Sequence, residues 1–154
     1  MKKIFLSQNK IAIVDDWWFD YLMQWKWCAS WNPTTKGFYA MRVENKKTIY
    51  MARVVAKTPN GMYCDHIFHR TLDNRESQLR NVTYSQSSMN RKTRCDNKLG
   101  RKGIFKFSDR PGFRAQLVVK GDYLLCKTFQ TLDEAIEARR LAEERHFGEF
   151  SSRE

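Results

Sequence analysis

The stretch 61–90 reads GMYCDHIFHRTLDNRESQLRNVTYSQSSMN, and its pattern predicts a β-loop-β-helix unit. Residues 62–67 and 79–84 are strand-like runs, and the polar segment 69–78 lies between them. Residues 85–92 follow as a short polar helix, with the first serine as its expected cap. A unit of about 30 residues is too small to fold without neighbours or a metal. The unit should therefore be stabilised either by contacts with its neighbours or by a bound metal.

The preceding region, residues 1–60, is rich in aromatic residues and predicts a small β-rich unit. Strand-like runs occupy residues 3–6, 10–14, 38–43 and 48–51. The pair Asp15-Asp16 predicts the start of a short helix that runs through Trp25. Two roles are open for the tryptophans, a hydrophobic core or a surface on which bases stack. They are Trp17, Trp18, Trp25, Trp27 and Trp31.

The following region, residues 96–154, predicts three antiparallel strands packed on one helix. Strand-like runs occupy residues 103–107, 113–120 and 123–129. Gly121-Asp122, between the last two runs, is a turn signal. Thr131 and Glu134 form a capping box at the helix start, and Gly148 is expected to end the helix. We expect one face of this sheet to cover the helix and the other to be polar and basic. With the upstream units, this predicts an α+β fold.

Composition limits the class of partner. The chain has 154 residues and 28 Lys and Arg against 17 Asp and Glu, a formal net charge of +11. An excess of this size suggests a polyanionic partner. We expect no membrane partner, because no apolar run approaches the roughly 20 residues of a membrane helix.

The cysteines do not show the spacing of a structural zinc site. Such sites use pairs two to four residues apart, and these four are scattered evenly along the chain. We therefore expect no structural zinc. Because the apolar stretch near residue 5 is too short for an export signal, we also expect reduced, partly buried thiols in an intracellular, cytoplasmic protein. The four residues are Cys28, Cys64, Cys95 and Cys126.

The dipeptide Asp65-His66 is the strongest candidate for chemistry. A carboxylate is a hard oxygen ligand for a divalent cation, and imidazole has a pKa near neutrality that suits a general base. Adjacent residues in a strand point to opposite faces, so both groups could serve one phosphate only if the strand bends at its end. A purely structural Asp-His pair is the alternative.

The segment 61–90 resembles the HNH nuclease motif found in phage and intron homing endonucleases. The resemblance rests on Asp65-His66-Ile67, Leu72-Asp73-Asn74-Arg75, Leu79-Arg80 and residues 85–90. It implies a ββα-metal nuclease motif over residues 61–95, after a leader region at 1–60. The leader matches that of these enzymes at Val14-Asp15-Asp16, Lys26-Trp27 and Tyr39-Ala40.

The segment 96–154 resembles the plant ethylene-response (Apetala-two) DNA-binding domain that such nucleases often carry. The order of the two segments agrees with that fusion. The matching residues are Gly103-Ile104, Phe113-Arg114-Ala115, Phe129-Gln130-Thr131, Glu134-Ala135 and Phe147-Gly148-Glu149-Phe150.

The resemblance implies metal-assisted hydrolysis of duplex DNA. Asp65 would hold one Mg²⁺ or Mn²⁺ ion per site, and His66 would deprotonate the attacking water. The second ligand would be Ser87, where the family commonly has Asn, or Asn90 one helical turn later. Asn74 and Gln78 would support the site, and the family has Asn where Gln78 stands. Many relatives have His where Ala52 stands, so the chain departs from the pattern at three positions.

The implied partner is double-stranded DNA, bound by a monomer or weak dimer. A nicking or cutting endonuclease is one hypothesis, a DNA-binding protein with a decayed nuclease motif is the second, and RNA recognition by the tryptophans is a third. We expect Arg to read guanine, Gln to read adenine, and Lys to contact phosphates. The candidate DNA contacts are Arg91, Lys92, Arg94, Arg101, Lys102, Lys106, Arg114, Gln116, Lys120 and Lys127.

Overall fold

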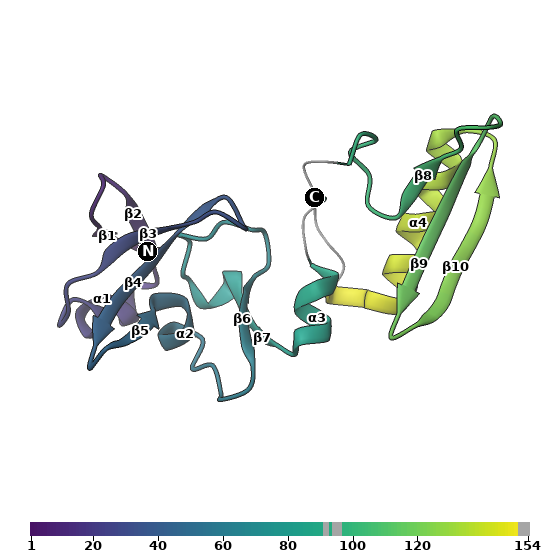
Figure 1. Ribbon diagram of the computed structural model, residues 1–154. Coiled ribbons are helices and arrows are strands. Elements are labelled where there is room, and N and C mark those ends of the chain that lie inside the picture. The colour runs from purple at the N-terminus through teal and green to yellow at the C-terminus, as the bar shows by residue number, and fades with distance from the viewer. Residues whose placement is uncertain (91–92, 94–96, 151–154) are drawn as a thin grey trace. The chain divides into compact units, whose positions relative to one another are not determined.

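A computed structural model describes residues 1–90, 93 and 97–150, and Figure 1 labels its helices and strands. The chain divides into two compact units, Met1–Ser87 and Ser88–Glu154. Helices and antiparallel sheets occur in both, which confirms the predicted α+β class. Among the described residues, no helix has the length and apolarity needed to cross a membrane. The predicted division at residues 60 and 95 stays a prediction.

The first unit begins with two antiparallel sheets and two short helices. The strands of each sheet follow one another in sequence, as expected for hairpin connections. The elements are β1 (Lys2–Phe5), β2 (Ile11–Val14), α1 (Asp16–Leu22), β3 (Cys28–Asn32), β4 (Gly37–Glu44), β5 (Lys47–Tyr50) and α2 (Met51–Val55).

The core of the first unit accounts for most of the tryptophans. Trp27 is buried and donates from Nε1 to the Leu22 carbonyl at 2.8 Å, while Trp18 and Trp25 pack partly buried against the core. Trp17 and Trp31 are 70% and 51% exposed. The core role is therefore confirmed for three of the five.

Three details of this region differ from prediction. Helix α1 ends at Leu22 rather than Trp25, and Asp15 makes no side-chain cap bond there. The Asp15 carboxylate instead accepts from the Glu76 amide at 2.8 Å, far along the chain. Strand β3 and helix α2 were not predicted, because their apolar residues belong to one core and do not alternate regularly.

The predicted β-loop-β-helix unit is present, and its strands and the start of its helix belong to the first unit. Strands β6 (Tyr63–His66) and β7 (Leu79–Val82) pair antiparallel, with the 3₁₀ turn η1 (Glu76–Gln78) before β7 and helix α3 (Tyr84–Met89) after it. Ser85 is not the cap. Thr83 accepts from the Gln86 amide at 3.3 Å and donates its own amide to Gln86 Oε1 at 2.8 Å, a reciprocal capping box.

The second unit has the predicted three-stranded sheet and helix. Strand β9 (Phe113–Val119) lies between β8 (Ile104–Lys106) and β10 (Asp122–Phe129), and α4 (Leu132–Phe147) packs on one face. The short turn η2 (Gly148–Phe150) follows α4. The Thr131–Glu134 capping box and the stop at Gly148 are confirmed, and Gly148 has a positive φ of 52°.

The β9–β10 turn lies one residue earlier than predicted, at Lys120-Gly121. Val119 pairs with Asp122, and both turn residues have positive φ, as a two-residue type I′ hairpin requires. Lys120 therefore belongs to the turn and not to a strand face. Gly121 supplies one of the two left-handed positions at no steric cost.

The outward face of this sheet, opposite α4, is less basic than predicted. Directly opposed residues share a face, so Lys106 beside Phe113 and Lys127 beside Ala115 lie on the α4 side. Arg114 and Gln116 do face outward. The remaining outward residues are largely apolar or aromatic, and they include Phe105, Val118, Tyr123 and Cys126.

Candidate active site

His66 ends β6 with its side chain in the core of the first unit. The residue is 7% exposed, and its imidazole lies 6.1 Å from the Tyr39 ring in an edge-on arrangement. Its Nε2 lies 3.2 Å from Oδ1 of Asn74, which is 1% exposed. The structure thus brings together two predicted site residues, the candidate base and one supporting amide.

The contacts of Asn74 determine the tautomer of His66. Its Nδ2 faces two acceptors, the Leu72 carbonyl and the Met51 thioether, each at 3.5 Å. The amide NH₂ therefore lies on that side, and Oδ1 faces the imidazole. Because Oδ1 can only accept, Nε2 of neutral His66 carries the proton. The lone pair of the neutral ring is then on Nδ1.

The protonation state of His66 follows from its burial. Burial lowers the pKa of His66 below the ordinary 6.5, since the charged form is poorly solvated in the core. The hydrogen bond to Asn74 and the charge of Asp65 oppose this shift without cancelling it. His66 is therefore a neutral imidazole near pH 7, the form that a general base requires.

Asp65 pairs with an arginine that was not among the predicted site residues. Arg80 stands opposite Asp65 in the β6–β7 ladder, and its Nε donates to Asp65 Oδ2 at 2.9 Å. The side chains are 14% and 13% exposed, so the pair is shielded but reaches the surface. Arg80 could have been predicted if the register of the β6–β7 pair had been known, but the sequence alone does not give that register.

The bend that would place Asp65 and His66 on one face is absent from the described strand β6. The β6–β7 pairing is regular from Tyr63 opposite Val82 to His66 opposite Leu79. The two side chains thus leave opposite faces. We call the side with Tyr63, Asp65 and Arg80 the Asp65 face. The side with Cys64, His66, Leu79 and Asn81 is the His66 face.

The loop that positions Asn74 is held by the leader region. The Ile13 amide donates to the Leu72 carbonyl at 2.9 Å, and the Asn74 amide donates to the Ile13 carbonyl at 2.7 Å. Asp73, between them, is 6% exposed and pairs with Arg75 at 2.6 Å, which lowers the pKa of its carboxyl. Strand β2 therefore fixes the loop that orients His66.

The remaining predicted site residues have different surroundings. Gln78 acts through its backbone, since its carbonyl accepts from the Ile67 amide at 3.0 Å. Ser87 is half-buried on α3, and its hydroxyl has no hydrogen-bond partner among the described residues. Asn90 is 1% exposed and belongs to the second unit. Ala52, one of the three positions that depart from the resemblance, is 6% exposed within the core.

The donor chemistry of the two candidate ligands, Asp65 and Ser87, is that of a site for a hard, weakly held cation. Among the described residues, no group of three or more His, Cys, Asp or Glu side chains could hold a metal. Mg²⁺ commonly takes one or two carboxylates and keeps water and phosphate as its other ligands. The Asp65 carboxylate and an available Ser87 hydroxyl match that requirement. Zinc would need a fuller set of nitrogen or sulfur ligands.

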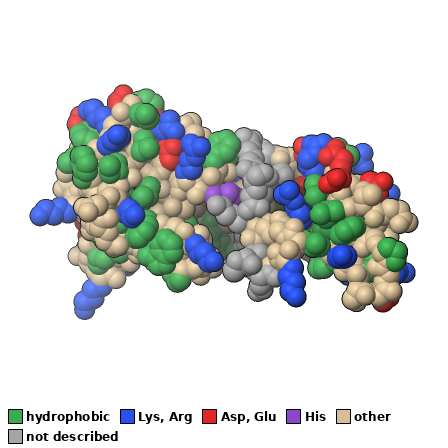
Figure 2. All heavy atoms as spheres, turned by 90° about the horizontal axis from the view of Figure 1, so that it is seen from above, with side chains coloured by type: hydrophobic (Ala, Val, Ile, Leu, Met, Phe, Trp, Pro, Cys, Tyr) green, Lys and Arg blue, Asp and Glu red, His purple; other side chains and the backbone are tan. Residues whose placement is uncertain are grey.

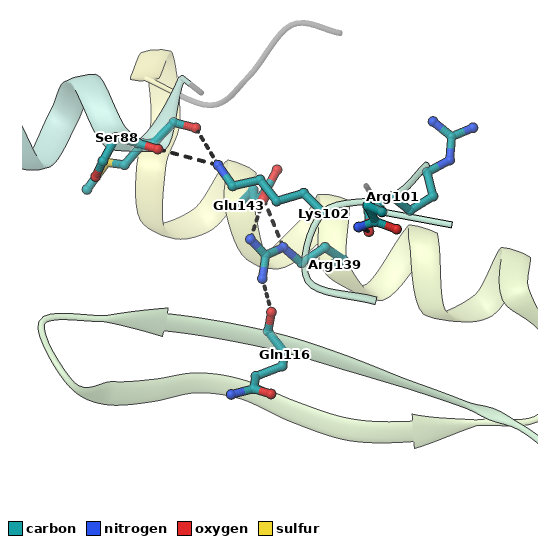
Figure 3. A network of polar contacts seen from close by, with 8 residues as sticks. Ser88, Arg101, Lys102, Gln116, Arg139 and Glu143 are labelled. Carbon is teal, nitrogen blue, oxygen red and sulfur yellow. Dashed lines mark hydrogen bonds and ion pairs between the residues drawn. The ribbon is translucent and has the colours of Figure 1, made fainter. Parts of the chain in front are cut away.

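Two of the candidate DNA contacts, Lys102 and Gln116, take part in polar contacts of the second unit (Figure 3). Lys102 donates from Nζ to the carbonyls of Ser88 and Met89, at 3.4 and 3.1 Å. It therefore caps the end of α3 by its charge and hydrogen bonds. In the same view, buried Arg139 bonds the Gln116 carbonyl and Glu143. Arg101 is exposed beside this network.

The basic surplus is not confined to the second unit. Figure 2 shows Lys and Arg side chains over both units on the face drawn. Residues 1–87 contain 13 Lys and Arg against 7 Asp and Glu. Arg91, Lys92 and Arg94, three candidate DNA contacts, lie outside the described residues. The positive field that attracts a polyanion thus includes the Asp65–His66 unit.

The chain is similar to one protein whose name states an activity. A protein of Acanthamoeba polyphaga mimivirus, named Uncharacterized HNH endonuclease L560, is 28% identical to this chain over 148 residues. The match covers 96% of this chain and 72% of that protein. No family model and no solved structure matches the chain. The similarity supports a nuclease function in general.

Proposed function

We propose that the chain is an HNH-type DNA endonuclease of the homing class, which hydrolyses a phosphodiester bond with His66 as general base. The observation that carries the proposal is the His66–Asn74 pair. The buried amide holds neutral imidazole with its basic nitrogen at Nδ1. The neighbouring Asp65 supplies the carboxylate that such a site needs, and the similarity to the mimivirus protein agrees with it.

The residues of the first unit have distinct roles in this proposal. Asn74 orients the imidazole, and Asp65 with Ser87 would hold one Mg²⁺ or Mn²⁺ ion. The ion would supply Lewis-acid stabilisation of charge on the leaving oxygen. Arg80 pairs with Asp65 at 2.9 Å and would hold its carboxylate in place. The burial of Asn90 favours Ser87 as the second ligand.

A plasmid assay tests the proposal. We expect the protein to nick or linearise supercoiled DNA with Mg²⁺ or Mn²⁺, and His66→Ala to lower the rate by roughly 10²–10⁴-fold, the usual contribution of a general base. His146→Ala is the matched control, because that histidine is exposed on α4. Equal rates for wild type and His66→Ala, or no cleavage of any DNA tested, would reject the assignment.

A specific observation favours a second candidate function, DNA binding by a decayed nuclease. His66 is 7% exposed and faces away from Asp65, and Asp65 is already paired with Arg80. This candidate predicts tight binding without metal and no cleavage with any divalent ion. Recovery of cleavage in Ser87→Asn would support decay, and robust cleavage by the native chain would remove it.

We further propose that the outward face of the C-terminal sheet contacts duplex DNA. Arg114 and Gln116 on β9 are the side chains that suit base edges in the major groove. We expect Arg114→Ala to weaken binding to a preferred duplex about tenfold at fixed salt. Lys127→Ala, on the α4 side, should have a smaller effect. Equal losses in the two variants would contradict this choice of face.

A further inference from the structure

Two exposed tyrosines contact each other where β6 and α3 begin. The rings of Tyr63 and Tyr84 are 5.9 Å apart between centroids and tilted by 57°. Tyr63 is 48% exposed and Tyr84 is 62% exposed. The pair thus presents aromatic surface to solvent within the unit Met1–Ser87, and it is not used by the hydrolytic chemistry described above.

The positions of the tyrosines in their elements place them beside the candidate metal ligands. Tyr63 lies two residues before Asp65 on the same face of β6, a separation of about 7 Å. Tyr84 lies three residues before Ser87 on the same side of α3, about one helical turn. The contact between the two rings brings this side of α3 to the Asp65 face. The pair therefore borders the Asp65–Ser87 site.

A comparison with Tyr39 shows why exposure of this pair is informative. Tyr39 is half-buried, and its ring lies 6.2 Å from Tyr50 and 6.1 Å from His66, so it is explained by packing. Tyr63 and Tyr84 keep much of their surface outside the core. A tyrosine ring combines an apolar face with a polar hydroxyl, which suits contact with a wet partner.

The charge balance of this unit favours a nucleic acid strand as the partner, since residues 1–87 contain 13 Lys and Arg against 7 Asp and Glu. Arg80 shares the face with Tyr63, and its guanidinium is bonded to Asp65 at 2.9 Å, so the pair adds no net charge to this surface. Stacked bases rise by about 3.4 Å per step, so the roughly 7 Å between Asp65 and Tyr63 along β6 corresponds to about two base steps. Any base has a π-face that can stack on an aromatic ring.

We propose that the Tyr63–Tyr84 pair is a stacking surface for an unpaired nucleobase, one or two nucleotides from the bond that the Asp65 face would address. The inference rests on the proposed nuclease function for the identity of that bond. The proposal predicts that the preferred substrate is a DNA in which the base at this position is not paired within the duplex. Stacking on tyrosine compensates for the base pair that such a substrate lacks.

Binding without cleavage tests the stacking surface. Fluorescein-labelled duplexes that differ only in one base, paired or opposite an abasic site, are titrated with the full chain in EDTA and followed by anisotropy. We expect the wild type to bind the unpaired duplex severalfold more tightly. Tyr63→Ala and Tyr84→Ala should each weaken that complex by roughly tenfold and reduce the preference.

Three further variants separate stacking from other effects. Tyr84→Phe keeps the ring and should keep the preference, whereas Tyr84→Leu keeps apolar bulk and should lose it. Trp17→Ala removes an exposed aromatic ring from α1 and should change nothing. Melting curves establish that each variant is folded. A wild type without preference, or a preference that survives in both alanine variants, would overturn the proposal.

The outcome is distinguishable from a failure of the proposed function. The plasmid assay with His66→Ala reports cleavage, and the anisotropy assay needs neither cleavage nor metal. Loss of cleavage with an intact preference would reject the endonuclease and keep the stacking surface. Normal cleavage without a Tyr63- and Tyr84-dependent preference would reject the surface and keep the endonuclease.

Discussion

The two faces of β6 hold their reactive groups in different surroundings. On the His66 face, Cys64 and His66 lie against the core, and burial shifts both pKa values toward the neutral form. On the Asp65 face, the carboxylate is paired with Arg80 and an exposed tyrosine stands two residues away. One strand thus presents the proposed base to one side and the proposed metal ligand to the other.

This difference shows how a four-residue strand can separate two chemical tasks. A base works when it is neutral and firmly oriented, which a core and a buried amide provide. A metal or phosphate contact works when it is charged and near solvent, which the other face provides. The proposed reaction needs both groups at the end of β6, so substitutions on the two faces should have different signatures.

The largest effect is expected on the Asp65 face. Asp65→Asn keeps the shape of the side chain but removes the charged ligand, and we expect cleavage to fall on the order of a thousandfold. Glu143→Gln is the control, because it breaks another shielded ion pair, that with Arg139. Plasmid cleavage rates measure both. Similar losses would mean that ion pairing, and not metal or phosphate contact, explains the effect.

Thiol reactivity measures how well the His66 face is sealed. Burial raises the pKa of Cys64 to about 11 from an ordinary 9.0, while Cys126 is exposed on β10. Because the thiolate reacts, we expect iodoacetamide to label Cys64 about a hundredfold more slowly than an unperturbed thiol at pH 8. Peptide mass spectrometry separates the two sites. Equal labelling would show that the face is open.

Asn74 should affect both stability and the orientation of the base. Asn74→Ala leaves the buried Nε2 proton of His66 without its acceptor, which should cost about 1–3 kcal/mol in the free energy of unfolding and lower cleavage roughly tenfold. Urea unfolding and the plasmid assay measure these changes.

A second substitution at Asn74 distinguishes positioning from a structural role. Asn74→Asp places a negative charge beside the imidazole, so the pKa of His66 should rise. The acid limb of the pH–cleavage profile should then move to higher pH. An unchanged profile in a folded, active variant would contradict the contact between Asn74 and the catalytic base.

The smallest effect is expected in the pH dependence of stability. The pKa of His66 is below 6.5 in the folded chain, so the unfolded chain binds more protons between the folded value and 6.5. Stability should therefore fall as the pH drops below about 6.5. His66→Gln should flatten this slope in denaturant titrations at pH 7 and pH 5. If stability falls equally with pH in the wild type and in His66→Gln, the pH dependence comes from another titrating group.

Only part of the candidate site could be proposed from the sequence, and the roles of its residues stay predictions. Asp65, His66 and Asn74 were identified by resemblance and by residue chemistry, and the structure joins His66 to Asn74. Arg80 was missed because its role depends on the register that sets it opposite Asp65. The prediction that Lys127 faces outward was wrong for the same reason. Lys127 stands opposite Ala115 in the β9–β10 ladder, and this register places its side chain on the α4 side of the sheet.

Local sequence determined the elements whose signals lie within a few residues. Alternation in β9, the Thr131–Glu134 capping box and the turn residues near Gly121 are short-range effects of backbone geometry and hydrogen bonding. Tertiary structure decided the rest. Strand β2 clamps the loop of Asn74, and Asp15 binds the Glu76 amide instead of capping its own helix. Such contacts join residues about 60 positions apart, and only packing of the whole unit brings them together.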